Sequence, residues 1–286
     1  MSFMDHIRAC NRRDMSGFRP WWAAGVRVGW LRHGLAERLL GFPAVFQATG
    51  DGVALAAELN QPAARSQAVA VAAAALAAAG VIPAARGELY PVLERWGASP
   101  LLVVDRAWAS CFGVTAYGLH VNGFVRRADG GLDLWLGHRA RDRLVAPGQL
   151  DNMIAGGLPT GLSLRENLLK EAQEEAGLGA EIAGRARPVG ALSYAMETES
   201  GLRPDVMFLY DLELSEDEIP VNQDGEVERF ERAPVEQVAE IVRHTNRFKF
   251  NCNLVVLDFL FRHGILDPDQ PDYVDLLAAS RAWPVL

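Results

Sequence analysis

The chain has 286 residues, half of them hydrophobic and 22% charged, which is typical of a globular protein with one large domain or two ordinary ones and not of a disordered protein. Its formal net charge of −8 argues against a nucleic-acid backbone as the main partner. The three cysteines, Cys10, Cys111 and Cys252, are far apart and lack the CxxC spacing. We therefore expect reduced, buried thiols and neither a disulfide framework nor a zinc site.

Residues 1–112 are predicted to form a smaller N-terminal α+β domain. Helices are expected at 4–15 and 34–40, a short strand at 27–30, an alanine-rich helix at 68–80, and an apolar strand or helix start at 101–104. The polar N-terminus does not resemble a secretory signal, and the alanine run is about half as long as a membrane span. We therefore expect a soluble, cytoplasmic protein with no membrane partner. The aromatic residues Trp21, Trp22 and Trp30 are interpreted as core residues, with stacking on a ligand ring as the alternative.

Residues 113–286 have a strand-rich pattern. Strands are expected at 114–126, 132–137, 186–194, 206–214 and 227–231, and helices at 235–243 and 252–263. The turn Asp129-Gly130-Gly131 predicts a hairpin between the first two strands. His120 on the first strand is interpreted as a hydrogen-bonded core residue.

A further helix is predicted between Ser163 and Gly177. Ser163 followed by Glu166 has the spacing of a capping box, and Gly177 stands where a C-terminal cap glycine is expected. Leu164 and Leu168 begin an apolar stripe, so the helix is expected to pack against a sheet.

This helix carries three acidic residues on one face. Glu171, Glu174 and Glu175 are spaced i, i+3 and i+4, which brings their carboxylates close together. Such a cluster is costly unless cations neutralise it, and Mg²⁺ is a hard ion that takes oxygen ligands. Magnesium held in this way suits the hydrolysis of a phosphoanhydride. An ordinary solvated acidic face is the alternative.

The stretch from Gly156 to Leu178 resembles the Nudix box, Gly-x5-Glu-x7-Arg-Glu-aliphatic-x-Glu-Glu-x-Gly-aliphatic. Gly156, Gly177, Leu178 and the three glutamates match this motif. Two positions depart from it, because Leu162 replaces the first glutamate of the box and Lys170 replaces its arginine. The resemblance implies an α/β/α sandwich over residues 113–286 and a Mg²⁺-dependent hydrolase, with Mn²⁺ as a substitute. It also implies that the three glutamates and the backbone carbonyl of Gly156 hold the metal.

A narrower resemblance covers almost the whole chain. It is carried by FGVTAYGLHVNGFV, LVAPGQLDNMIAGGLPTG, LRPDVMFLYDLEL, VNQDGEVERF and FKFNCNLVVLDFLFRHG. These segments resemble the Nudix subgroup related to thiamine pyrophosphokinase, in which an uncharacterised domain precedes the Nudix fold. The subgroup also favours a residue other than glutamate at the position of Leu162. The resemblance implies a diphosphatase that converts thiamine diphosphate, or its oxidised or damaged analogues, to the monophosphate and phosphate.

Nudix enzymes usually use one more acid from outside the box. Glu226 is the first candidate for this catalytic role, because it follows a glycine and enters a strand, and Glu228 is the second. Both also fit the pattern of solvated acids. Lys170 is expected to pair with Glu171 and hold it in place, with a solvated lysine as the alternative.

The candidate substrate-binding residues precede the box. Arg139 and Arg141 follow a strand and are expected to clamp a terminal phosphate, with a surface pair as the alternative. Asp151 and Asn152 come just before the box turn, where they line the pocket or hold the turn. Asp151 and Glu197 are expected to form an acidic rim suited to a cationic ring.

Three other functions stay open at this point. The chain fits a Nudix hydrolase of nucleotide diphosphates such as ADP-ribose, less well an isopentenyl-diphosphate isomerase, or a non-catalytic ligand-binding module. Retention of all three helix glutamates argues against the last. The oligomeric state also stays open, with a homodimer as one alternative.

Overall fold

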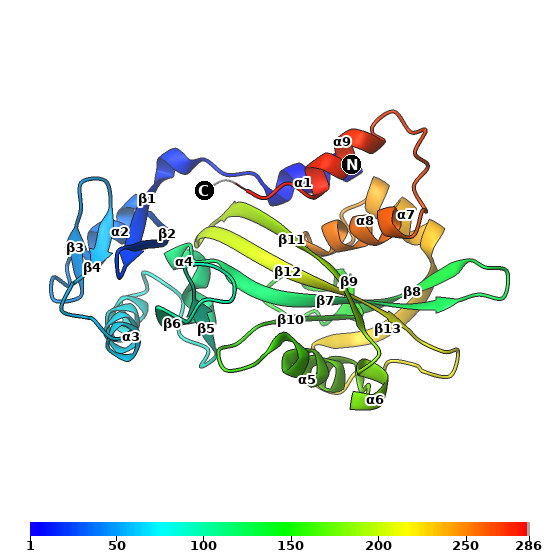
Figure 1. The fold of residues 1–286 in the computed structure, drawn as a ribbon, viewed down its shortest axis with the longest axis horizontal. Coiled ribbons are helices and arrows are strands. Elements are labelled where there is room, and N and C mark those ends of the chain that lie inside the picture. The colour runs from blue at the N-terminus through cyan, green and yellow to red at the C-terminus, as the bar shows by residue number, and fades with distance from the viewer. Residues whose placement is uncertain (285–286) are drawn as a thin grey trace.

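The structure, a computed structural model, describes residues 1–284 and has two parts (Figure 1). The N-terminal part contains α1 (Phe3–Cys10), α2 (His33–Leu39), α3 (Pro62–Ala78), α4 (Ala109–Phe112) and the 3₁₀ turns η1 (Met15–Gly17) and η2 (Arg106–Trp108). Its strands are β1 (Phe18–Ala23), β2 (Val26–Arg32), β3 (Phe46–Ala48), β4 (Val53–Leu55), β5 (Leu89–Val92) and β6 (Leu102–Asp105).

The N-terminal part is built on a four-stranded sheet of order β2-β1-β4-β3 and a separate β5–β6 hairpin. Trp21 is fully buried in its core, and its indole N–H donates to the carbonyl of Phe112 at 2.7 Å. The buried Arg65 of α3 donates to the carbonyl of Leu101 at 2.8 Å, which ties this helix to the β6 end of the hairpin. The interpretation of Trp21 as a core residue is therefore confirmed.

The second part contains a seven-stranded sheet of order β11-β12-β7-β8-β13, in which β10 pairs with β7 and β9 with β8. Its strands are β7 (Ala116–Arg126), β8 (Leu132–Arg139), β9 (Leu150–Asn152), β10 (Ile154–Gly157), β11 (Arg187–Thr198), β12 (Gly201–Glu213) and β13 (Val227–Pro234). Its helices are α5 (Leu164–Ala176), α6 (Ala180–Ala183), α7 (Val235–His244), α8 (Cys252–Arg262) and α9 (Tyr273–Ser280).

Helices cover both faces of this sheet (Figure 1). On one face, Leu168 and Ala172 of α5 pack in a core with Leu119 and Val121 of β7. On the other, α7, α8 and α9 form a second core that also includes Phe3 and other residues of α1. Burying a leucine such as Leu168 stabilises the fold by about 1.5–3 kcal/mol. The α+β class and the Nudix-type sandwich are confirmed, whereas the predicted boundary after residue 112 stays a prediction.

Several element boundaries differ from those predicted. The first helix ends at Cys10 instead of residue 15, because the Asn11 side chain donates to the carbonyl of Ile7 at 3.0 Å and Arg13 donates to the carbonyl of Ala195 in β11 at 3.2 Å. The alanine-rich helix begins earlier, with Pro62 in its first turn. Strands β1, β3, β4, β5, β9 and β10 were not predicted. Within the described residues, no helix is long and apolar enough to cross a membrane.

Candidate active site

Helix α5 begins and ends as its sequence predicts. Ser163 Oγ accepts the N–H of Glu166 at 3.2 Å, and the Glu166 carboxylate accepts the N–H of Ser163 at 2.8 Å. Gly177 closes the helix with φ 63°. The Asn167 side-chain amide donates to the carbonyl of Gly157 at 2.9 Å, which ties the helix to β10. The helix therefore presents its glutamates in one fixed orientation.

Two of the box glutamates pair with a lysine, and the third accepts a backbone N–H. Lys170 Nζ lies 3.2 Å from Oε1 of Glu171 and 2.6 Å from Oε2 of Glu174. Glu175 Oε2 accepts the N–H of Ala155 in β10 at 2.9 Å. Lys170 thus pairs with Glu171, as predicted, and bridges it to Glu174 as well.

The electrostatics of this cluster fit a divalent cation. Burial raises the pKa of Glu171 and raises the pKa of Glu175 well above its usual range, and the Glu171 charge adds to the shift at Glu175. A Cβ at Gly156 would lie 2.4 Å from Cδ of Glu171, so only glycine leaves room for this carboxylate. Three clustered carboxylates are the oxygen donors that Mg²⁺ and Mn²⁺ take.

The strand register determines which backbone carbonyl faces the glutamates. Gly156 lies opposite Leu119 of β7, and Leu158 N–H donates to the carbonyl of Tyr117 at 2.8 Å. Because hydrogen-bonded and non-hydrogen-bonded pairs alternate along antiparallel strands, Gly156 directs its C=O toward β7. Ala155 directs its C=O to the opposite side, where its N–H meets a box glutamate. Gly156 as a metal ligand stays a prediction, and the register favours the carbonyl of Ala155.

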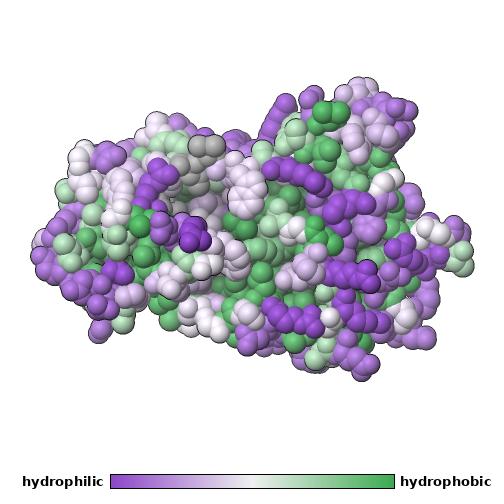
Figure 2. All heavy atoms as spheres, viewed as in Figure 1, coloured by the Kyte–Doolittle hydropathy of each residue, from purple (hydrophilic) through white to green (hydrophobic). Residues whose placement is uncertain are grey.

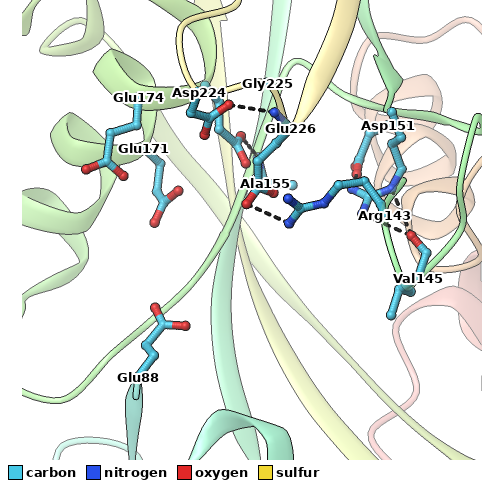
Figure 3. A network of polar contacts seen from close by, with 12 residues as sticks. Glu88, Arg143, Val145, Asp151, Ala155, Glu171, Glu174, Asp224, Gly225 and Glu226 are labelled. Carbon is cyan, nitrogen blue, oxygen red and sulfur yellow. Dashed lines mark hydrogen bonds and ion pairs between the residues drawn. The ribbon is translucent and has the colours of Figure 1, made fainter. Parts of the chain in front are cut away.

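Glu226 lies near Ala155, across from the box helix (Figure 3). Its carboxylate is 2.6 Å from the guanidinium of Arg143, and with Ala155 it lines a cavity of about 320 Å³. Glu228 instead accepts the N–H of Arg141 at 3.3 Å and does not line this cavity. The geometry therefore favours Glu226 over Glu228 as the acid from outside the box.

The predicted substrate-binding residues occupy different positions. Arg139 lines the same cavity, but its guanidinium pairs with Asp151 and donates to the carbonyl of Val145 at 3.0 Å. Arg141 is exposed and lines neither this cavity nor the smaller one beside Gly156. Asp151 was expected either to line the pocket or to hold the turn before the box. It is 3% exposed, which favours the second role.

A buried polar network lies beneath Ala155. His120 is 5% exposed, and its Nδ1 lies 2.9 Å from Oδ1 of Asn152, so it is the hydrogen-bonded core histidine that was predicted. His120, Asp151 and Cys252 have ligand atoms within 4.8 Å of one another. The Asp151 carboxylate is already neutralised, however, by Arg139 and by Lys249, whose Nζ lies 3.1 Å away. A metal ion is therefore not expected in this network.

The rim that was expected to be acidic is cationic. Six basic side chains line the cavity that contains Glu226: Arg86, Arg106, Arg139, Arg143, Arg203 and Lys249. Its acidic lining residues are Asp142 and Glu226. Glu197 pairs instead with Arg32 at 2.9 Å and does not line this cavity. Five of these residues, Arg86, Arg106, Arg143, Arg203 and Lys249, were not predicted from the sequence, because they belong to no common motif and come together only in the folded chain.

An aromatic cavity of about 440 Å³ lies beside the apolar cluster that includes Leu162 of the box loop. Trp96 lies with its ring centroid 4.9 Å from Tyr117 and 4.6 Å from Phe208, and Trp283 completes the aromatic lining. Tyr117 and Val206 also line the smaller cavity beside Gly156, but that cavity is lined by Asp205 and Met207 as well, whereas the aromatic one is lined by Pro204 and Phe208, so the two lie on opposite faces of β12. Figure 2 shows hydrophobic atoms between the two parts of the molecule, bordered by hydrophilic ones.

Comparison with known proteins yields two family matches and two close relatives. Residues 2–116 match a domain of unknown function (DUF4743), and residues 116–253 match the NUDIX domain. The chain is 43% identical to Nudix hydrolase 24, chloroplastic, and 42% identical to Nudix hydrolase 20, chloroplastic, both of Arabidopsis thaliana; each alignment spans 98% of this chain and 77% of the relative.

Among solved structures, DR0079 from Deinococcus radiodurans is 23% identical and has a TM-score of 0.42, over 59% of this chain and 96% of that one. The relatives and the domain match determine the assignment. The chain belongs to the Nudix hydrolases, as an enzyme of the pyrophosphatase class that acts on a diphosphate substrate.

Proposed function

We propose that this enzyme hydrolyses thiamine diphosphate or its oxidised or damaged analogues to the monophosphate and inorganic phosphate, with Mg²⁺ as cofactor and Mn²⁺ as a substitute. The observation that carries the proposal is the aromatic cavity, whose residues Tyr117 and Phe208 also belong to the apolar cluster around Leu162 of the box loop. Trp96 and Trp283 both line this cavity, where a flat ring of the thiamine type would stack on an indole and a positively charged ring would gain cation–π attraction. The resemblance to the thiamine pyrophosphokinase-related subgroup supports the same substrate class.

The phosphate end of the substrate lies between the box glutamates and the basic side chains that line the cavity containing Glu226. Glu171, Glu174 and Glu175 would hold the metal together with the carbonyl of Ala155, and Lys170 fixes the first two carboxylates. Magnesium, when bound, supplies a Lewis acid that offsets the negative charge on the diphosphate.

The chain's own residues supply the remaining chemistry. Glu226 accepts a proton from the attacking water, and Arg143, 2.6 Å away, holds its carboxylate in position. Arg203 and Lys249 line both cavities beside Ala155 and offset the charge of the terminal phosphate under attack, while the monophosphate ester departs as the leaving group. Arg139 supports this wall through Asp151 and lies too deep to be the main clamp. The expected cytoplasmic location stays a prediction.

An assay that measures both inorganic phosphate and nucleoside monophosphate across a panel of diphosphates tests the substrate, because hydrolysis of the diphosphate bond of ADP-ribose gives two monophosphate esters and no inorganic phosphate. Thiamine diphosphate, its oxidised analogues and ADP-ribose are compared with Mg²⁺, with Mn²⁺ and with a chelator. We expect phosphate from the thiamine compounds only, loss of the reaction with chelator, and ¹⁸O from labelled water in the inorganic phosphate. Cleavage of ADP-ribose alone would contradict the substrate class and leave the Nudix chemistry intact. Inactivity on the whole panel would favour a non-catalytic module.

A further inference from the structure

The β5–β6 hairpin of the N-terminal part is built directly onto the strand and loop of the box. Thr160, in the loop before α5, donates its N–H to the carbonyl of Leu89 at 2.8 Å. A Cβ at Gly157 would lie 1.8 Å from the hydroxyl oxygen of Tyr90, so this glycine is needed for the hairpin to approach β10. The N-terminal part therefore contacts the site itself and is not a separate appendage.

A single buried carboxylate fixes the end of this hairpin. Asp105 is 3% exposed and accepts the backbone N–H groups of Arg86 at 3.0 Å, Gly87 at 2.7 Å and Ala107 at 2.9 Å. The N–H of Arg106 donates to the carbonyl of Glu88 at 2.8 Å. The backbone on both sides of the hairpin end is thereby ordered before any ligand binds, which lowers the entropy cost of using its side chains.

These bonds hold two charged side chains beside the catalytic residues. Glu88 projects toward Glu171 across the site (Figure 3) and pairs with Arg106. The guanidinium of Arg106 lies 5.9 Å from the ring centroid of Tyr90 and lines both cavities next to Ala155. Arg106 is therefore the residue through which the N-terminal part reaches the cationic side of the site.

We propose that Arg106 binds a non-bridging oxygen of the terminal phosphate, so that the N-terminal domain supplies part of the phosphate-binding site. A guanidinium has five N–H donors in a planar fork, and the pairing with Glu88 leaves others free for a phosphate. Arg203 and Lys249 line the same two cavities, so a phosphate there meets cations from both parts of the chain. This inference rests on the proposed diphosphatase function and adds a residue to it.

The test is the affinity for inorganic phosphate, the expected product, measured by calorimetry in the presence of Mg²⁺. Arg106→Gln should weaken phosphate binding ~10-fold or more and raise KM for the diphosphate by a similar factor. Arg106→Lys should recover part of the affinity, since it restores the charge without the fork. Arg38→Gln, at an exposed position on α2, is the matched control and should leave both quantities unchanged.

Glu88→Gln separates phosphate binding from a merely structural ion pair. It removes the same pair as Arg106→Gln, but it should strengthen phosphate binding, because a competing carboxylate is gone. Equal losses of phosphate affinity in both variants, or wild-type affinity and KM in Arg106→Gln, would overturn the inference. An enzyme inactive on every diphosphate would count against the proposed function instead, and the phosphate titration would still report on Arg106.

Discussion

The two sides of the active site are encoded in different ways. The acidic side is a short stretch of α5, where Lys170, Glu171, Glu174 and Glu175 lie close together within the box. The cationic side collects Arg86, Arg106, Arg143, Arg203 and Lys249 from segments distributed over most of the chain. The metal chemistry shared by a family is thus local in sequence, whereas the surface that selects a substrate forms only when distant segments pack together.

The departure at Leu162 follows from this difference. Leu162 packs against an apolar cluster formed by Tyr117, Leu158 and Val206, to which Leu93 of the N-terminal part also contributes. A glutamate there would place an unpaired carboxylate in apolar surroundings, which is costly. Leucine at this position is explained by the docking of the N-terminal part and does not indicate a damaged box.

The largest expected effect comes from breaking the acidic side. Glu174→Gln should lower kcat by ~100-fold or more, because it removes charge from the metal site without removing a core contact. The Glu174 side chain is 49% exposed, so the melting temperature without metal should stay near that of the wild type. Steady-state kinetics with saturating Mg²⁺ and a thermal melt provide the two measurements.

Glu181→Gln is the matched control for this substitution. Glu181 is an exposed acid in the first turn of the next helix, α6, and belongs to no part of the site. It should retain wild-type kcat. Wild-type turnover in Glu174→Gln would remove that residue from the mechanism and would leave the cationic side as the main source of catalysis.

The sequence predicted those features that depend on neighbouring residues. The capping box at Ser163, the cap at Gly177 and the turn at Asp129-Gly130-Gly131 all form as expected, because each requires only a few adjacent side chains. The strand at 206–214 was also predicted, because its apolar and polar residues alternate, and it forms the C-terminal part of β12.

Features that depend on tertiary contacts were beyond sequence patterns. The three-residue strands β3, β4 and β9 are too short for a clear alternation. Arg106 had no recognisable signal, because its role depends on the buried carboxylate of Asp105, which orders the backbone around it. Asp151 was expected at an acidic rim, but its carboxylate is neutralised inside the fold by Arg139 and Lys249.

A second, smaller effect should sharpen the comparison at the ring end of the substrate. Trp96 also comes from the N-terminal part and lies against Tyr117 and Phe208. Trp96→Ala should lower kcat/KM for a thiamine-type diphosphate about 30-fold, within the range of stacking losses seen on alanine substitution. A short alkyl diphosphate, which has no ring, is the control substrate and should lose little. Equal losses on both substrates would show that Trp96 supports the fold and does not bind the ring.

The smallest effect concerns His120, in the buried polar network beneath Ala155. Burial lowers the pKa of His120 from 6.5 to about 4, and the positive charge of Lys249 acts in the same direction. In the unfolded chain this histidine takes up a proton below about pH 6.5, whereas in the folded chain it does so only near pH 4. Its contribution to stability is therefore present above pH 6.5 and is lost as the pH falls. Between pH 7 and pH 5 the loss should be about 1–2 kcal/mol.

Urea unfolding at the two pH values measures this loss, with His120→Gln as the comparison. Glutamine can still bond to Asn152 but does not titrate, so the variant should lose less stability on acidification than the wild type does. The raised pKa values of Glu171 and Glu175 act with the opposite sign, because their folded forms become less costly as they take up protons. These groups are common to both proteins, so the difference between the two pH dependences isolates His120. Identical pH dependences would show that the pKa of His120 is not lowered by burial, and that water reaches the polar network beneath Ala155.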